Sequence, residues 1–194
     1  MTVTAIMSAM AAVLMFIDFS VPIMPEFIKL DISELPALIS SFAFGPVSGI
    51  AVCFIKNVIN FIAHGRTGGI GEICNFLLGV MFVVPASLIY QKMKSRKGAI
   101  LGVVVGALTM AAVSIPLNYF VTYPMYSKFM PIDVIVSMYQ EIASKFVPSS
   151  NLNGLLSCLV IFNAPFTFFK GILDAIICFL IYKPLSPILK GKKI

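Results

Sequence analysis

The chain has 194 residues, of which 59% are hydrophobic and only 11% are charged, and its mean hydropathy is +1.01. A soluble domain has about a quarter of its residues charged, so this composition excludes an ordinary water-soluble protein. The formal net charge of +6 comes mainly from two basic clusters that directly follow apolar segments, a placement that membrane topology explains better than a nucleic-acid partner does.

The first part of the chain predicts three helices. An apolar helix over 3–19 is followed by a proline-containing loop. A short apolar segment, 35–44, then meets Gly45-Pro46. Because Gly-Pro disfavours continuation of a helix, we expect a separate helix over 46–63 after a tight turn.

The second part predicts three longer helices, over 69–93, 98–121 and 155–183. Between the last two, the stretch 122–153 is more polar and contains prolines. We interpret it as an external connection that includes a short amphipathic helix at 132–146.

These six segments predict an all-α integral membrane protein with a single membrane domain, residues 1–194, and six transmembrane helices. An even number of crossings places both termini on one side, together with the basic loop after the fourth helix. The positive-inside rule assigns that side to the cytoplasm. The basic residues that decide the orientation are Lys92, Lys94, Arg96, Lys97, Lys183, Lys190, Lys192 and Lys193.

Polar side chains share one face of the last predicted helix. Asn163, Thr167, Lys170 and Asp174 are spaced i, i+4, i+7 and i+11, which places them on one stripe at about 100° per residue. An ionisable side chain at the centre of a bilayer costs about 3 kcal/mol or more, so such residues usually face a protein-lined cavity. The alternative is structural, with Lys170 and Asp174 neutralising each other within the helix.

A second polar stripe lies on the third predicted helix, where Lys56, Asn60 and His64 recur every four residues. Lys56 is the deeper cation, and Glu72 or Asp174 could supply its partner. A single His has no metal-ligand constellation around it, so we expect no metal site.

The outer ends of the fourth and fifth helices add further polar groups, namely Glu72, Asn75 and Asn118. We expect all these groups to converge on a pocket that opens outward beneath the loops 20–35 and 122–153. Its members are mostly amides and hydroxyls, which suits a neutral ligand with many hydrogen-bonding groups.

Catalytic motifs are missing. The sequence has no GxxxxGK[ST] phosphate loop, so we expect that it does not hydrolyse ATP itself. GxSxG and HExxH are also missing, and a single His supports no Ser-His-Asp set. We therefore expect no enzymatic activity and no cofactor, but a subunit that captures a substrate and depends on partners. A membrane scaffold or an enzyme that uses Glu72 and His64 is an alternative of a different class.

A partner surface is predicted on the first helix, where the small residues Ala5 and Ala9 are spaced by four. Small residues at this spacing let another helix approach closely within the membrane. Internal packing in the same bundle is the alternative reading of this pair.

Five segments are distinctive: FIKLDISELPALIS, FGPVSGIAVCFIKNVINFI, GGIGEICNFLLG, Leu117-Asn118-Tyr119 and APFTFFKG. Through them the chain resembles, over nearly its full length, the riboflavin-specific S components of energy-coupling factor (ECF) vitamin transporters. The resemblance implies a six-helix S-component fold in the bacterial cell membrane that captures riboflavin from outside for ATP-driven uptake. It also implies a transmembrane coupling protein (T component) and two cytoplasmic ATPases as partners.

The resemblance also implies roles for particular residues. Asn118 and Lys170 would hydrogen-bond the isoalloxazine ring, and the loop from Pro25 through Leu30 to Asp31 would close over the ligand. Docking to the partner would use the first helix, in agreement with the small residues there.

One position departs from the family pattern. The last helix of relatives usually reads PFNxxKG, whereas this chain reads PFTFFKG. The ring-contacting Asn is thus replaced by Thr167, and Asn163, one turn earlier, is the residue that could compensate. FMN, another vitamin or a vitamin precursor is therefore the alternative substrate.

Overall fold

The structure is a computed structural model that describes residues 1–64, 68–128, 130–146 and 154–189, without the side chains of 64, 146 and 182–189. The basic tail at 190–193 and Arg66 therefore lie outside the described residues. The helical elements are α1 (Thr2–Phe16), α2 (Glu34–Phe44), α3 (Pro46–His64), α4 (Ile70–Met93), α5 (Arg96–Leu117), η1 (Asn118–Thr122), α6 (Tyr123–Tyr126), α7 (Ile132–Phe146), α8 (Leu155–Cys158), η2 (Leu159–Asn163) and α9 (Ala164–Leu189).

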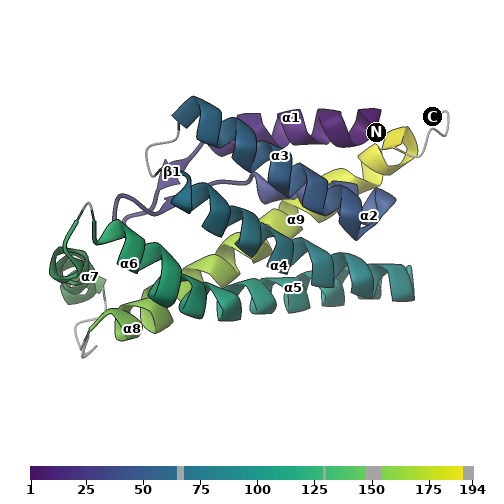
Figure 1. The fold of residues 1–194 in the computed structure, drawn as a ribbon. Coiled ribbons are helices and arrows are strands. Elements are labelled where there is room, and N and C mark those ends of the chain that lie inside the picture. The colour runs from purple at the N-terminus through teal and green to yellow at the C-terminus, as the bar shows by residue number, and fades with distance from the viewer. Residues whose placement is uncertain (65–67, 129, 147–153, 190–194) are drawn as a thin grey trace.

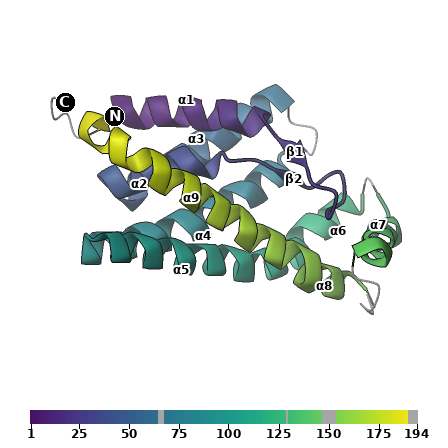
Figure 2. The same cartoon turned by 180° about the vertical axis from the view of Figure 1, so that it is seen from behind.

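The long helices form one bundle, which α9 crosses diagonally (Figures 1 and 2). Met1 and the last turn of α9 lie at the same end of the bundle. The loop between α1 and α2, together with α6, α7 and α8, lies at the opposite end. We call the end with Met1 and the last turn of α9 the termini end, and the opposite end the loop end.

Among the described residues, four helices are long and apolar enough to cross a membrane, covering Pro46–Ala63, Ile70–Met93, Arg96–Tyr126 and Leu155–Ile181. Helices α1 and α2 are apolar but have only 15 and 11 residues. At 1.5 Å per residue, α2 is about 16 Å long, roughly half of a bilayer core. The sequence predicted six full crossings, and the lengths of these two helices do not establish the remaining two.

Helix α2 is buried along most of its length, from Glu34 to Phe42, and lies in the half of the bundle near the termini (Figures 1 and 2). It therefore occupies the interior of the bundle over these residues. A half-length helix inside the bundle leaves space toward the loop end, and the cavity described below occupies that space.

One of the long helices extends beyond its prediction at the loop end. The predicted helix 98–121 continues through η1 and α6 to Tyr126. Both η1 and η2 are π-helical turns of five residues, and each ends two residues before a proline, Pro124 or Pro165. Proline cannot donate a helical hydrogen bond and crowds the preceding turn, so a wider turn accommodates it and the helix continues.

The loop between α1 and α2 carries a small hairpin, which the all-α prediction did not include. Strand β1 (Phe19–Ser20) pairs antiparallel with β2 (Lys29–Leu30), with Phe19 opposite Leu30. Asp18 and Lys29 form an exposed ion pair of 2.9 Å at the base of the hairpin. After β2 the chain enters the bundle, so Asp31 and the start of α2 are buried.

Helices α4 and α5 lie side by side along their length in both views (Figures 1 and 2). Gly102 allows this approach, because a Cβ atom there would lie 2.5 Å from the carbonyl oxygen of Ala86. Close packing of helices through small residues is typical of membrane bundles. The pair forms one wall of the cavity.

Candidate functional site

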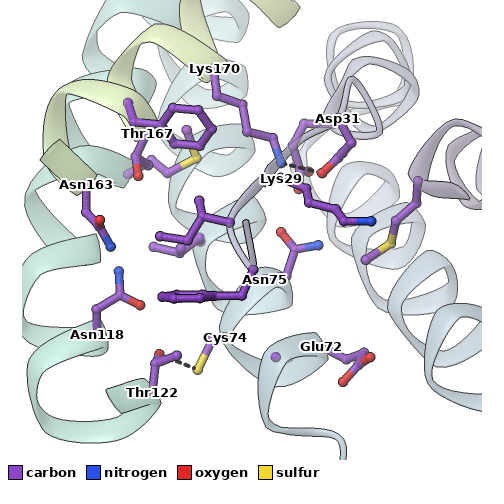
Figure 3. A pocket seen from close by; sticks show the side chains of 18 of the residues that line it. Lys29, Asp31, Glu72, Cys74, Asn75, Asn118, Thr122, Asn163, Thr167 and Lys170 are labelled. Carbon is purple, nitrogen blue, oxygen red and sulfur yellow. Dashed lines mark hydrogen bonds and ion pairs between the residues drawn. The ribbon is translucent and has the colours of Figure 1, made fainter. Parts of the chain in front are cut away.

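A cavity of about 300 Å³ lies at the loop end of the bundle, within the range of about 300–1,000 Å³ typical of small-ligand pockets. The hairpin loop, α2, α3, α4, the α5–α6 segment and the η2–α9 segment all contribute lining residues (Figure 3). It is the space that the short α2 leaves unfilled.

Most of the predicted ligand contacts line this cavity. These are Asp31, Glu72, Asn75, Asn118, Asn163, Thr167 and Lys170. Pro25 and Leu30 are not among its lining residues. Pro25 instead lines a second cavity of about 350 Å³ between the loop and α7. The loop therefore reaches the first cavity through its later residues, including Phe27 and Asp31.

Lys170 projects from α9 to Asp31, with 2.8 Å between Nζ and Oδ2, and each side chain is 12% exposed. The alternative in which Lys170 and Asp174 form an ion pair within the helix is therefore not what the structure shows. Asp31 also accepts hydrogen bonds from the backbone N–H and the hydroxyl of Ser33. Burial raises the pKa of the Asp31 carboxyl, but Lys170, Lys56 and these hydrogen bonds outweigh burial and hold that pKa well below its ordinary value.

A second ion pair lies at the base of the cavity. Lys56 on α3 contacts Glu34 at 2.6 Å, with both side chains almost fully buried, and also donates to the Ser33 hydroxyl at 2.7 Å. Neither Glu72 nor Asp174 is its partner, so that prediction is wrong. Glu34 fits here because Gly79 has no side chain: a Cβ atom there would lie 2.8 Å from Glu34 Oε2.

The two ion pairs meet at Ser33, so a single polar network runs from Lys170 through Asp31 and Ser33 to Lys56. Asp174, one turn beyond Lys170 on α9, is fully buried, and its carboxyl oxygens have no hydrogen-bond partner among the described residues. Of the stripe predicted on the last helix, Asn163, Thr167 and Lys170 therefore line the cavity, whereas Asp174 does not.

Amides connect α3 to α4 along the cavity. Asn60 donates to Glu72 at 3.2 Å, and Asn75 donates to Asn57 at 3.2 Å. Glu72 and Asn75 lie in the first two turns of α4, at the loop end of the bundle. The side chain of His64, the third member of the predicted stripe on α3, lies outside the described residues.

On the opposite side of the cavity, the amides of Asn163 and Asn118 face each other (Figure 3). The π-helical turns place them, because Asn118 begins η1 and Asn163 ends η2. Thr122, at the other end of η1, donates to Cys74 Sγ at 3.2 Å. Sequence reasoning missed both Thr122 and Cys74, and Pro124 after η1 was the available signal for Thr122 alone.

Aromatic side chains supply apolar faces. Phe27 from the loop packs edge-on against Tyr123 and Tyr126, with ring centroids 6.3 and 6.4 Å apart. Phe166 from α9 also lines the cavity. Aromatic rings beside amides and hydroxyls suit a ligand that has a flat ring system with polar edges.

The electrostatics favour an uncharged ligand. Both lysines in the described lining already have acidic partners, Lys29 with Asp18 and Lys170 with Asp31. Among the described residues, no three or more His, Cys, Asp or Glu side chains are grouped so that they could hold a metal ion. The arrangement is suited to binding through hydrogen bonds and ring contacts.

Helix α1 presents Ala5 and Ala9 on its exposed face, whereas Met7, Ser8 and Ala11 face the bundle. The two alanines are thus not packed inside this chain, in contrast to the alternative reading. Their role in docking a partner stays a prediction.

A helical membrane protein with a polar cavity at its loop end is the class that fold and site define together. The family described as "ECF transporter, substrate-specific component" matches residues 1–182. The chain belongs to this family of ECF transporter substrate-specific components.

Curated relatives and a solved structure are similar over most of the chain. The riboflavin transporter FmnP of Bacillus subtilis is 31% identical over 96% of this chain and 92% of its own length. The riboflavin transporter RibU of Staphylococcus aureus is 34% identical over 96% of this chain and 89% of its own length. A solved S component of a bacterial ECF transporter superposes with a TM-score of 0.74 at 33% identity, covering 97% of this chain and 96% of that one.

Proposed function

We propose that this protein captures riboflavin outside the cell for ATP-driven uptake powered by partner subunits. The observation that carries the proposal is the cavity of about 300 Å³ lined by amides, hydroxyls and aromatic rings. Relatives named as riboflavin transporters, at 31% and 34% identity over nearly the whole chain, support the choice of ligand.

The ligand contacts in this proposal come from two sides of the cavity. Asn118, Asn163, Thr167 and Lys170 bind polar edges of the isoalloxazine ring, and Thr167 takes the position of the family's Asn. Glu72 and Asn75 on α4 face the same space. Phe27 closes over the ring from the loop, together with the segment from Pro25 to Asp31.

Riboflavin fits the charge balance of the cavity better than FMN does. A phosphate needs several unpaired cations at one place, and the two lysines in the described lining are each held by an aspartate at 2.8–2.9 Å. A neutral vitamin binds without breaking the pair at the base of the hairpin, whereas FMN competes with Asp18 for Lys29.

The proposed membrane arrangement is a single domain, residues 1–194, with six crossings in which α1 and α2 complete the bundle. The termini end faces the cytoplasm and the loop end faces outward. The exposed alanines of α1, Ala5 and Ala9, contact the T component, which in turn carries two cytoplasmic ATPases. The common position of Met1 and the end of α9 at one end of the bundle supports this arrangement.

The test begins with protein purified in detergent without added vitamin. We expect flavin absorption bands, riboflavin released on denaturation and identified by mass spectrometry, and quenched flavin fluorescence when riboflavin is added to stripped protein. FMN, titrated in parallel, should bind more weakly. Colourless protein that fails to quench added riboflavin would overturn the proposal.

A further inference from the structure

Asn163 belongs to a buried polar group with two tyrosines from other elements. Tyr123 on α6 is 2% exposed, Tyr139 on α7 is 0% exposed, and Asn163 at the end of η2 is 5% exposed. The hydroxyls of Tyr123 and Tyr139 are 2.7 Å apart, Tyr139 donates to Asn163 Oδ1 at 2.5 Å, and Asn163 Nδ2 donates to the Tyr123 hydroxyl at 3.2 Å.

The donor inventory fixes the direction of these three hydrogen bonds. Each phenol has one hydrogen to donate, and Tyr139 uses its hydrogen on Asn163. Tyr123 must therefore donate to Tyr139, while it accepts from the Asn163 amide. The result is a closed ring in which each member donates once and accepts once, and such chains of hydrogen bonds strengthen one another.

Burial keeps this ring intact at ordinary pH. Desolvation raises the pKa of the Tyr139 hydroxyl far above its ordinary value, and the nearby Tyr123 adds to this effect. Tyr139 therefore remains a hydrogen-bond donor throughout the physiological range.

The ring leaves part of the Asn163 amide unused. An amide has two N–H donors and two carbonyl lone pairs, and the two tyrosines occupy one of each. Asn163 and Tyr123 line the cavity, whereas Tyr139 is not among its lining residues. The remaining N–H and lone pair of Asn163 thus have a fixed orientation, and Tyr139, which lies outside the cavity lining, sets it.

Tyr139 also connects this amide to a separate helix. On α7, Ile135, Tyr139 and Ala143 recur every four residues and are all buried, so one face of the helix packs onto an apolar cluster that includes Leu159 and Phe162. Tyr139 is the member of that face with a polar group, and its hydroxyl reaches the Asn163 amide.

We propose that Tyr139 is a positioning residue for ligand binding: it orients the Asn163 amide, so that the affinity of the cavity depends on the docking of α7. The inference rests on the proposed function, because it takes Asn163 as a contact of bound riboflavin. It assigns α7, none of whose described side chains lines the cavity, a part in recognising the ligand.

The experiment is a double-mutant cycle on riboflavin affinity, with Tyr139→Phe, Asn163→Ala and the double variant in the detergent-purified protein. Tyr139→Phe removes one hydroxyl and should weaken binding about three- to tenfold. Because Tyr139 acts through Asn163, it should have no further effect in the Asn163→Ala background. The visible absorption band of bound riboflavin should also shift in the same direction in both single variants.

Tyr119→Phe is the matched control, because Tyr119 is 38% exposed and is not among the cavity lining residues; its affinity should equal that of the unmodified protein. Full additivity in the cycle, or unchanged affinity in Tyr139→Phe, overturns the inference while the proposed function stands. If the unmodified protein does not bind riboflavin, both fail. If Tyr139→Phe does not fold, Tyr123→Phe opens the same ring and enters the same cycle, with the same criteria.

Discussion

The pairing of Lys170 with Asp31 makes it possible to separate ligand binding from stability at one position. Lys170→Met keeps an unbranched side chain that is one atom shorter, and it removes the charge. The two side chains are 2.8 Å apart and each is 12% exposed, which places the pair between exposed pairs worth about 0–1 kcal/mol and buried pairs whose disruption costs about 3–5 kcal/mol. We therefore expect Lys170→Met to destabilise the fold by about 2 kcal/mol, because Asp31 is left without its cation.

A direct contact with the ligand adds a second effect. A charge-assisted hydrogen bond to riboflavin is worth about 1.5–3 kcal/mol, so Lys170→Met should weaken binding about tenfold to a hundredfold. The double variant Asp31→Asn with Lys170→Met removes both charges, so it should recover most of the stability but not the affinity.

The assay combines thermal unfolding in detergent without ligand and fluorescence-quenching titration with riboflavin, on the same preparations. Asp31→Asn alone is the control for loss of the carboxylate. If the double variant regains affinity together with stability, Lys170 acts only by holding Asp31 and is not a ligand contact. Unchanged affinity in Lys170→Met would remove Lys170 from the binding site altogether.

Three further predictions concern the charges around the cavity. Asp174→Asn should leave thermal stability unchanged or raise it, since the buried carboxyl has no hydrogen-bond partner among the described residues; a clear loss in thermal unfolding would contradict this. Glu34→Gln should destabilise by about 3–5 kcal/mol, because it leaves Lys56 buried without its anion, and Glu34→Gln combined with Lys56→Met should recover stability in the same assay. The folded-state pKa of Asp31 is depressed, so its contribution is present above its unfolded pKa of about 3.9 and is lost as the pH falls below it. Unfolding measured from pH 7 to pH 3 should show a slope that Asp31→Asn reduces; an equal slope in both proteins would refute the assignment.

The helical periodicity of the last predicted helix, 155–183, was sufficient to place three of its polar residues. Asn163, Thr167 and Lys170 line the cavity because residues spaced by three and four share a face of any helix. The same reasoning included Asp174, which is buried outside the lining. Periodicity identifies a face of a helix, but it does not say which part of that face meets a cavity and which part meets other helices.

Local sequence patterns could not predict the ion-pair partners of the two buried lysines, because those partners lie far away in the sequence. Lys170 pairs with a residue 139 positions away, and the i, i+4 rule offered Asp174 instead. Glu34 was overlooked as the partner of Lys56 because 35–44 was read as a membrane crossing of its own. The short length of that segment, with an acid at its start, was the signal that it lies inside the bundle.

The contribution of α7 and of the π-helical turns to the site could be predicted only in part. The amphipathic pattern indicated the helix at 132–146 but not the contact of Tyr139 with Asn163, because that contact depends on how α7 docks. The π-helical turns change which residues face inward near Asn118 and Asn163. Pro124 and Pro165 mark their positions, yet a proline in the sequence is equally compatible with the end of a helix.

The half-length of α2 has a consequence for the empty protein. Where a full helix would continue toward the loop end, the interior holds a void bounded by Glu34 and the aromatic rings. A ligand bound there makes packing contacts that a longer α2 would otherwise make, so the protein has more packing contacts with the ligand than without it. A bound vitamin would therefore contribute packing to the interior of its own carrier, and the free energy of unfolding should be larger with riboflavin than without it.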